Sequence, residues 1–230
     1  MFFPNFVDAC SNGYKKEASE LYNNNTIGMS DMKRAFRDCC TISRVGMAKW
    51  VLSKEPSLTE MTEFMTETFN YCVEYDVFTS ARYILSLRPD IEISDKLFAR
   101  CCDFGQIEMA KWLLSVKPTI DVSEFAFCRA CSSGHLELAQ WLVSVKPTIN
   151  ISANTDEAFR EACLFGRLDV VKWLISIKEM DEKVNRRGFE AAYVMEQADI
   201  MKLYYDNRGT MVGGGKIIEI YGNLVEMYAK

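Results

Sequence analysis

The sequence is short of histidine, of proline and of long apolar runs, and each shortage removes a class of function. It has one histidine and five prolines among 230 residues. A single imidazole leaves little scope for acid–base catalysis or for a histidine-rich metal site. No apolar run approaches the roughly 20 residues of a membrane-spanning helix. The first ten residues lack the basic start and apolar stretch of a secretory signal. We expect neither a membrane segment nor secretion.

A surplus of positive charge is also missing. The chain has 27 Lys and Arg against 32 Asp and Glu, a net charge of −5. An acidic surface repels phosphate backbones, so no nucleic acid is predicted as a partner. Hydrophobic residues make up 49% and charged residues 26%, which is the balance of a soluble folded protein.

The cysteine pattern argues against a disulfide framework. There are nine cysteines, an odd number, and they include the adjacent pairs Cys39–Cys40 and Cys101–Cys102. Free thiols persist in a reducing compartment, so the pattern predicts a cytoplasmic location.

A segment of about thirty residues repeats along the chain. FCRACSSGHLELAQWLVSVKP, from Phe127, returns as FARCCDFGQIEMAKWLLSVKP from Phe98 and as FREACLFGRLDVVKWLISIKE from Phe159. More divergent copies begin at Phe6, Phe36, Phe69 and Phe189. The chain is predicted to be one repeat domain, 1–230. Its units are approximately 1–31, 32–64, 65–93, 94–122, 123–154, 155–184 and 185–208, followed by a Gly-rich joint and a capping helix over 209–230.

The repeat explains the unusual composition, because rare residues fall in fixed columns. All four tryptophans lie fourteen residues after their opening phenylalanine, four of the five prolines share one column, and eight of the nine cysteines share two. The tryptophans are Trp50, Trp112, Trp141 and Trp173. This column is predicted to lie in the core, and a ligand-binding ladder is the alternative.

Each unit has the pattern of two short helices. In the first, the opening Phe and the Ala/Cys-Cys pair recur at i, i+3 and i+4, which makes one apolar stripe. It is predicted to end near Gly105, Gly134 or Gly166, since glycine tolerates the positive φ of a reversing turn. The second helix ends before Lys-Pro, because proline cannot continue it. One pair cannot bury its apolar faces alone, so the pairs must stack into an all-α solenoid.

The residues of these units resemble a known family. Ala130-Cys131-Ser132-Ser133-Gly134-His135-Leu136-Glu137, followed by Leu142-Val143, is similar to the ankyrin-repeat pattern A-A-x-x-G-H-L-E-V-V-x-x-L-L. The variant with F-x-x-A-C in front and W-L-L-S-x-K-P behind resembles the ankyrin-type repeats abundant in giant DNA viruses of amoebae. The resemblance implies a non-catalytic scaffold that binds a protein partner and needs no cofactor. If the protein is viral, it implies the host-cell cytoplasm.

The sequence departs from the family in ways that affect binding. No unit has the T-P-L-H that caps the first helix, and the glycine after the second helix is Lys or Arg in most units. Only Glu124, Phe125 and Ala126 separate Ser123 from Phe127, too few for the β-hairpin finger of a full-length repeat. We therefore predict an ankyrin-like solenoid with reduced or absent fingers, which binds mainly through its first helices.

Two local patterns suggest chemistry, and each has a structural explanation that we favour. Cys128-x-x-Cys131 has the spacing of a redox or zinc half-site, but a second ligand pair is missing and Cys131 belongs to a repeat column, so a core role is predicted. His135 would be the base of an enzyme, but its place after Gly134 favours a hydrogen-bonding role at the turn between helices.

The C-terminal segment invites a third chemical interpretation, which fails. Gly213-Gly214-Gly215-Lys216 is not a phosphate-binding loop, because that pattern needs Gly and Ser/Thr where Thr210 and Ile217 stand. The apolar side of the predicted helix that follows is expected to cap the solenoid, and a partner-binding helix is the alternative.

One pair of columns favours partner binding. The residue before the turn is bulky in most units, and the residue four positions earlier is often Tyr or Arg. On the concave side of the first helices these would form an apolar and arginine-bearing stripe. The predicted partner-binding residues are Tyr71, Tyr75, Arg100, Phe104, Arg129 and Phe165. The alternative is that they fill space left by missing hairpins.

We predict no enzyme and no metal, and a self-assembling structural or virion-associated protein is the alternative function.

Overall fold

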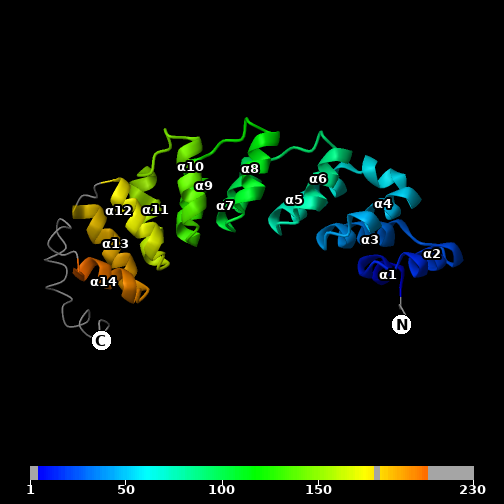
Figure 1. The fold of residues 1–230 in the computed structure, drawn as a ribbon, viewed down its shortest axis with the longest axis horizontal. Helices are drawn as coiled ribbons and strands as arrows, with labels where there is room; N and C mark the ends of the chain where they lie inside the picture. The colour runs from blue at the N-terminus through cyan, green and yellow to red at the C-terminus, as the bar shows by residue number, and fades with distance from the viewer. Residues whose placement is uncertain (1–4, 179–181, 207–230) are drawn as a thin grey trace. The chain divides into compact units, whose positions relative to one another are not determined.

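The computed structural model describes residues 5–178 and 182–206, and in these residues fourteen α-helices and one 3₁₀-helix occur, with no strand (Figure 1). The first helices of the repeats are α1 (Phe6–Asn12), α3 (Met29–Thr41), α5 (Thr62–Glu74), α7 (Asp95–Asp103), α9 (Glu124–Ser133), α11 (Ala153–Leu164) and α13 (Glu182–Val194). The second helices are α2 (Lys15–Asn24), α4 (Val45–Lys54), α6 (Phe78–Leu87), α8 (Ile107–Val116), α10 (Leu136–Val145), α12 (Leu168–Ile177) and α14 (Ala198–Asp206). The 3₁₀-helix η1 is Pro56–Glu60. The predicted all-α class without β-hairpin fingers is confirmed over this part of the chain.

The chain divides into two compact units, Met1–Leu97 and Phe98–Lys230. In the first unit α1, α3 and α5 pack side by side, and in the second α9, α11 and α13 do so (Figure 1). The predicted joint and capping helix over 209–230 lie outside the described residues.

The core of each unit is built from the apolar faces of both helices of each repeat, and the first helices carry its most regular pattern. The opening phenylalanines of the first helices are buried, and the cysteine columns beside them are buried as well. The phenylalanines are Phe6, Phe36, Phe69, Phe98, Phe127, Phe159 and Phe189. Burying one such side chain contributes roughly 1.5–3 kcal/mol, so the repeated Phe and Cys positions account for much of the stacking energy.

The turns between the two helices form as the glycine pattern predicts. Gly105, Gly134 and Gly166 have φ values of +71°, +88° and +71°. The turn at Gly105 also requires a residue without a side chain, because a Cβ there would lie 2.4 Å from His135 Nδ1. The next repeat therefore places its histidine directly over the glycine of the repeat before it.

The Lys or Arg that replaces the family's glycine after the second helix ties neighbouring repeats together. Arg88, at the C-cap of α6, donates from Nη1 to the Thr59 carbonyl at 2.8 Å. Lys146, at the C-cap of α10, donates from Nζ to the Val122 carbonyl at 3.0 Å. Both cap residues have negative φ, so this end of the helix does not need glycine.

The tryptophan column is half-buried rather than enclosed in the core, and that prediction was wrong. In the first unit the Trp50 ring lies 6.1 Å from Phe6, and in the second the Trp173 ring lies 6.2 Å from Phe127. Trp50 and Trp173 thus pack against the opening phenylalanine of the preceding repeat. An indole on a second helix is wide enough to make this contact while part of it stays exposed.

Candidate functional site

The predicted binding residues lie at the C-terminal ends of first helices. Tyr75 and Phe165 are the C-cap residues of α5 and α11, and Phe104 directly follows α7. The exposed fractions are 63% for Tyr75, 53% for Phe104 and 42% for Phe165. Tyr71 is also exposed, at 40%. These four aromatic rings are therefore available at the surface and do not fill space left by absent hairpins.

In the first unit two predicted tyrosines act as one surface feature. Tyr71 and Tyr75 are one helical turn apart, and their rings stack with centroids 4.2 Å apart and an interplanar angle of 21°. A hydrogen bond with Tyr75 raises the pKa of Tyr71. Ile42 occupies the same repeat position as Tyr75 and is 49% exposed. The pair offers flat apolar faces beside two hydroxyl groups.

In the second unit the predicted arginines lie over phenylalanine rings. The Arg100 guanidinium is 5.8 Å from the Phe104 ring centroid, and the Arg129 guanidinium is 5.8 Å from that of Phe125. Phe125 is 60% exposed. It was not predicted as a binding residue, because it stands outside the repeat columns. Its place four residues before Arg129 on α9 could have revealed it, because residues at i and i+4 share a helix face.

Asp103 orients this surface by linking the end of α7 to the next repeat. Arg129 Nε donates to Asp103 Oδ1 at 3.2 Å, and Ser133 Oγ donates to the same oxygen at 2.9 Å. His135 Nε2 lies 3.1 Å from the Asp103 carbonyl oxygen. The histidine thus makes the hydrogen bond at the turn that the sequence favoured. An exposed ion pair adds only about 0.2–1 kcal/mol, so the larger effect of Asp103 is to fix Arg129.

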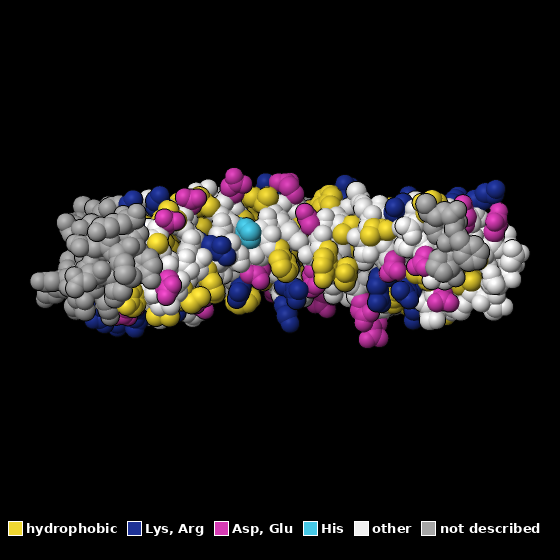
Figure 2. All heavy atoms as spheres, turned by 90° about the horizontal axis from the view of Figure 1, so that it is seen from below, with side chains coloured by type: hydrophobic (Ala, Val, Ile, Leu, Met, Phe, Trp, Pro, Cys, Tyr) yellow, Lys and Arg dark blue, Asp and Glu magenta, His cyan; other side chains and the backbone are white. Residues whose placement is uncertain are grey.

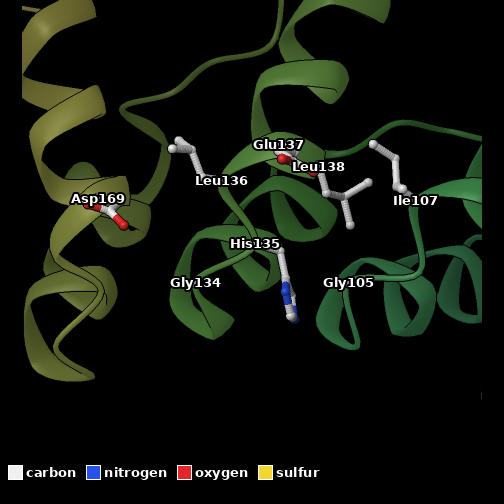
Figure 3. A pocket seen from close by; sticks show the side chains of 8 residues that line it. All are labelled: Gly105, Ile107, Gly134, His135, Leu136, Glu137, Leu138 and Asp169. Atoms are coloured by element: carbon white, nitrogen blue, oxygen red, sulfur yellow. The ribbon is translucent and has the colours of Figure 1, made fainter.

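A pocket of about 380 Å³ lies beside this turn (Figure 3). It is lined by Gly105, Ile107, Gly134, His135, Leu136, Glu137, Leu138 and Asp169. Figure 3 shows the His135 ring between Gly134 and Gly105, and the Asp169 side chain on α12, on the side of α10 to which Leu136 points. This pocket could not be predicted from the sequence, because its walls come from three successive repeats.

The turn side of the chain presents mixed chemistry. Figure 2 shows the single histidine, which is His135, with hydrophobic, basic and acidic side chains all reaching the surface around it. Aromatic and arginine side chains are enriched at surfaces that bind proteins, whereas acidic ones are not.

The cysteines of the Cys128-x-x-Cys131 pattern are core residues. Cys128 is 8% exposed and Cys131 is fully buried. Burial raises the pKa of the Cys128 thiol to about 12, which disfavours the thiolate needed for metal binding or redox attack. Within residues 5–178 and 182–206, no three His, Cys, Asp or Glu residues are grouped as a metal site would require. The geometry of this pair supports its structural role.

Stacked helix pairs with an exposed aromatic and arginine surface define a helical-repeat protein. The family model described as "Ankyrin repeats (3 copies)" matches residues 98–187. These residues form an ankyrin repeat region, as the sequence resemblance predicted, while the giant-virus variant type stays a prediction. No curated protein matches the sequence. Among the helices that the structure describes, none has the length and apolar character to cross a membrane.

Proposed function

We propose that this chain is a non-catalytic interaction module that grips a protein partner through the exposed side of its first helices. Ankyrin repeats generally mediate protein–protein interaction, and residues 98–187 are such repeats. The observation that carries the proposal is the exposure of Phe104 and Phe165 at equivalent turns of the second unit.

The arrangement of these residues suits binding. Binding energy at protein interfaces concentrates in a few aromatic and arginine residues. Phe104 and Phe165 stand in the short turns directly after first helices, and Asp103 already fixes Arg129. Little side-chain entropy is therefore lost when a partner docks. Tyr71 and Tyr75 form a second contact region, which belongs to the first unit.

The first prediction concerns the double variant Phe104→Ala/Phe165→Ala. Its affinity for a partner captured from native host cells is expected to fall at least about tenfold, since each change removes an exposed aromatic anchor. Its melting temperature should stay nearly constant, because exposed substitutions change stability by about 0.5 kcal/mol or less. Isothermal titration calorimetry measures the affinity and circular dichroism the melting.

A matched control lies on the second helices. Ile177 is 44% exposed, close to the 42% of Phe165, but it lies at the end of α12. Ile177→Ala is expected to leave partner affinity unchanged. Unfolding of the phenylalanine variant, or unchanged partner affinity in that variant, would rule out this surface as the binding site.

Self-assembly is a second candidate function, and one observation favours it. Val116, Val145 and Ile177 stand at the ends of α8, α10 and α12 and are 44%, 41% and 44% exposed. Each follows its tryptophan by one helical turn, so the second unit carries a periodic apolar stripe. A regular stripe can pair with the same stripe on a second copy, since a two-fold interface uses one patch twice.

Sedimentation equilibrium tests this second candidate. The self-association hypothesis predicts that the mass of the wild-type chain rises above 26.4 kDa with concentration. Val145→Lys should hold it at the monomer value, because the interface would bury an unpaired charge. A wild-type mass that stays at the monomer value throughout would exclude self-assembly and leave the first-helix proposal intact.

A further inference from the structure

One position of the repeat carries a carboxylate that forms an ion pair with a lysine in one copy but not in the next. The second residue of the second helix is Glu108, Glu137 or Asp169 in three successive repeats. Lys111 Nζ lies 2.8 Å from Glu108 Oε1. In the next repeat the position of this lysine holds Gln140, which carries no charge. Among the described residues neither Glu137 nor Asp169 forms an ion pair.

The two uncompensated carboxylates line the pocket of about 380 Å³ beside the turn. Its other walls are the His135 ring, the aliphatic side chains of Ile107, Leu136 and Leu138, and glycine backbone (Figure 3). Pockets of a few hundred Å³ are large enough to receive a single side chain or a small ligand. Aliphatic side chains beside two carboxylates match a side chain that has an aliphatic stem and a cationic end.

Arg167 is a basic residue close to this turn, and its side chain already hydrogen-bonds to the backbone. Arg167 lies over Gly134, where its Cδ would be 2.8 Å from a Cβ on that residue. Its Nε donates to the Ser132 carbonyl at 2.9 Å. Its Nε is engaged with the backbone, and among the described residues neither Arg167 nor Lys172, which is three residues after Asp169, forms an ion pair with Glu137 or Asp169.

We infer that this pocket receives a lysine or arginine side chain of the bound protein. The inference rests on the proposed function, and it specifies the chemistry of the partner. The stem of the incoming side chain packs on Leu136 and Ile107, and its cation lies near Glu137 and Asp169. Phe104 and Phe165 each precede the turn glycine of their own repeat, and these two repeats flank the one that carries His135 and Glu137. The partner segment therefore carries apolar residues beside its basic one.

A random 12-residue peptide library displayed on phage provides the probe. Selection on the wild-type chain is expected to enrich peptides that place Lys or Arg next to apolar residues. One selected peptide is then synthesised, and fluorescence anisotropy gives its Kd for the variants. Glu137→Gln/Asp169→Asn is expected to weaken binding at least about tenfold and to flatten the dependence of Kd on salt, since the cation loses both counter-charges.

Glu108→Gln is the matched control. It makes the same chemical change as the single variant Glu137→Gln at the same repeat position, but Lys111 already pairs with that carboxylate, so Kd should change less than about twofold, against a larger loss for Glu137→Gln alone. Equal losses in the control and the pocket variant would overturn the inference, because only the net charge would then matter.

The result also separates this inference from the proposed function. Selected peptides that lose affinity with Phe104→Ala/Phe165→Ala but not with Glu137→Gln/Asp169→Asn would overturn the basic-pocket assignment and leave the interaction surface standing. Peptides indifferent to both pairs of substitutions, or no enrichment at all, would overturn both.

Discussion

Gly188→Ala is expected to lower the free energy of unfolding by about 2 kcal/mol, although alanine is the better helix former. A Cβ at Gly188 would lie 2.6 Å from Phe159 Cε1, 2.6 Å from Tyr204 Oη and 3.1 Å from Cys163 Sγ. All three side chains are buried, so none can move into solvent. Overpacking of this kind destabilises by about 1–3 kcal/mol, and the helix propensity of alanine offsets at most about 1 kcal/mol.

Gly46 gives the opposite result for the same substitution. It lies in α4, and nothing is within 4 Å of where its Cβ would be. Gly46→Ala is expected to raise the free energy of unfolding by about 0.5–1 kcal/mol. Urea unfolding followed by circular dichroism measures both variants. If both glycines respond with the same sign, the close approach of α13 to α11 and α14 does not control stability.

Lys178→Met is expected to destabilise the chain by about 3 kcal/mol. Lys178 Nζ lies 2.8 Å from Asp156 Oδ1, and the Asp156 side chain is only 9% exposed. Removal of the lysine leaves a buried carboxylate without a counter-charge, which costs several kcal/mol. Lys178 also donates to Ser152 Oγ, so the same loss frees the N-cap and the first turn of α11.

The backbone of that segment adds to the expected loss. Asn154, Thr155 and Asp156 have φ values of +53°, +61° and +59°. Left-handed backbone costs roughly 1–2 kcal/mol per non-glycine residue, so the contacts of Lys178 must hold three strained residues in place. Asp156→Asn together with Lys178→Met should recover part of the stability, because no charge is then left buried.

Lys146→Met is the matched control in the same repeat column. Lys146 Nζ lies 3.1 Å from Asp121 Oδ1, but the Asp121 side chain is 60% exposed. Water can solvate the aspartate that is left behind, so a loss below about 1 kcal/mol is expected. Urea unfolding again provides the measurement. A loss as large as that of Lys178→Met would mean that burial of the partner carboxylate is not the cause.

Much of the fold could be predicted because helix formation and repetition are local properties. The spacing of Phe and Cys at i, i+3 and i+4 predicts which face of each first helix is buried, and Phe127 and Cys131 are buried as expected. The glycine positions predict the turns, and Gly105, Gly134 and Gly166 adopt positive φ. These features depend on neighbours along one helix, so a single sequence contains them.

The candidate site was predictable only in part. The sequence correctly marked Phe104 and Phe165 as unusual for their place before a turn, but it left open whether they are exposed or fill space. Phe125 escaped notice because it stands outside the repeat columns. The pocket of Glu137 and Asp169 was missed because its walls lie about thirty residues apart in sequence, in successive repeats.

The sequence by itself determined that this is an all-α repeat protein with buried thiols and glycine turns, since each of these follows from periodicity within a unit. Tertiary structure alone decided that the tryptophans are half-buried, that Lys and Arg after the second helices tie repeats together, and that the aromatic residues at the turns reach the surface. The physical reason is that exposure and ion pairing depend on how adjacent repeats stack, and stacking joins residues that no pattern within one repeat connects.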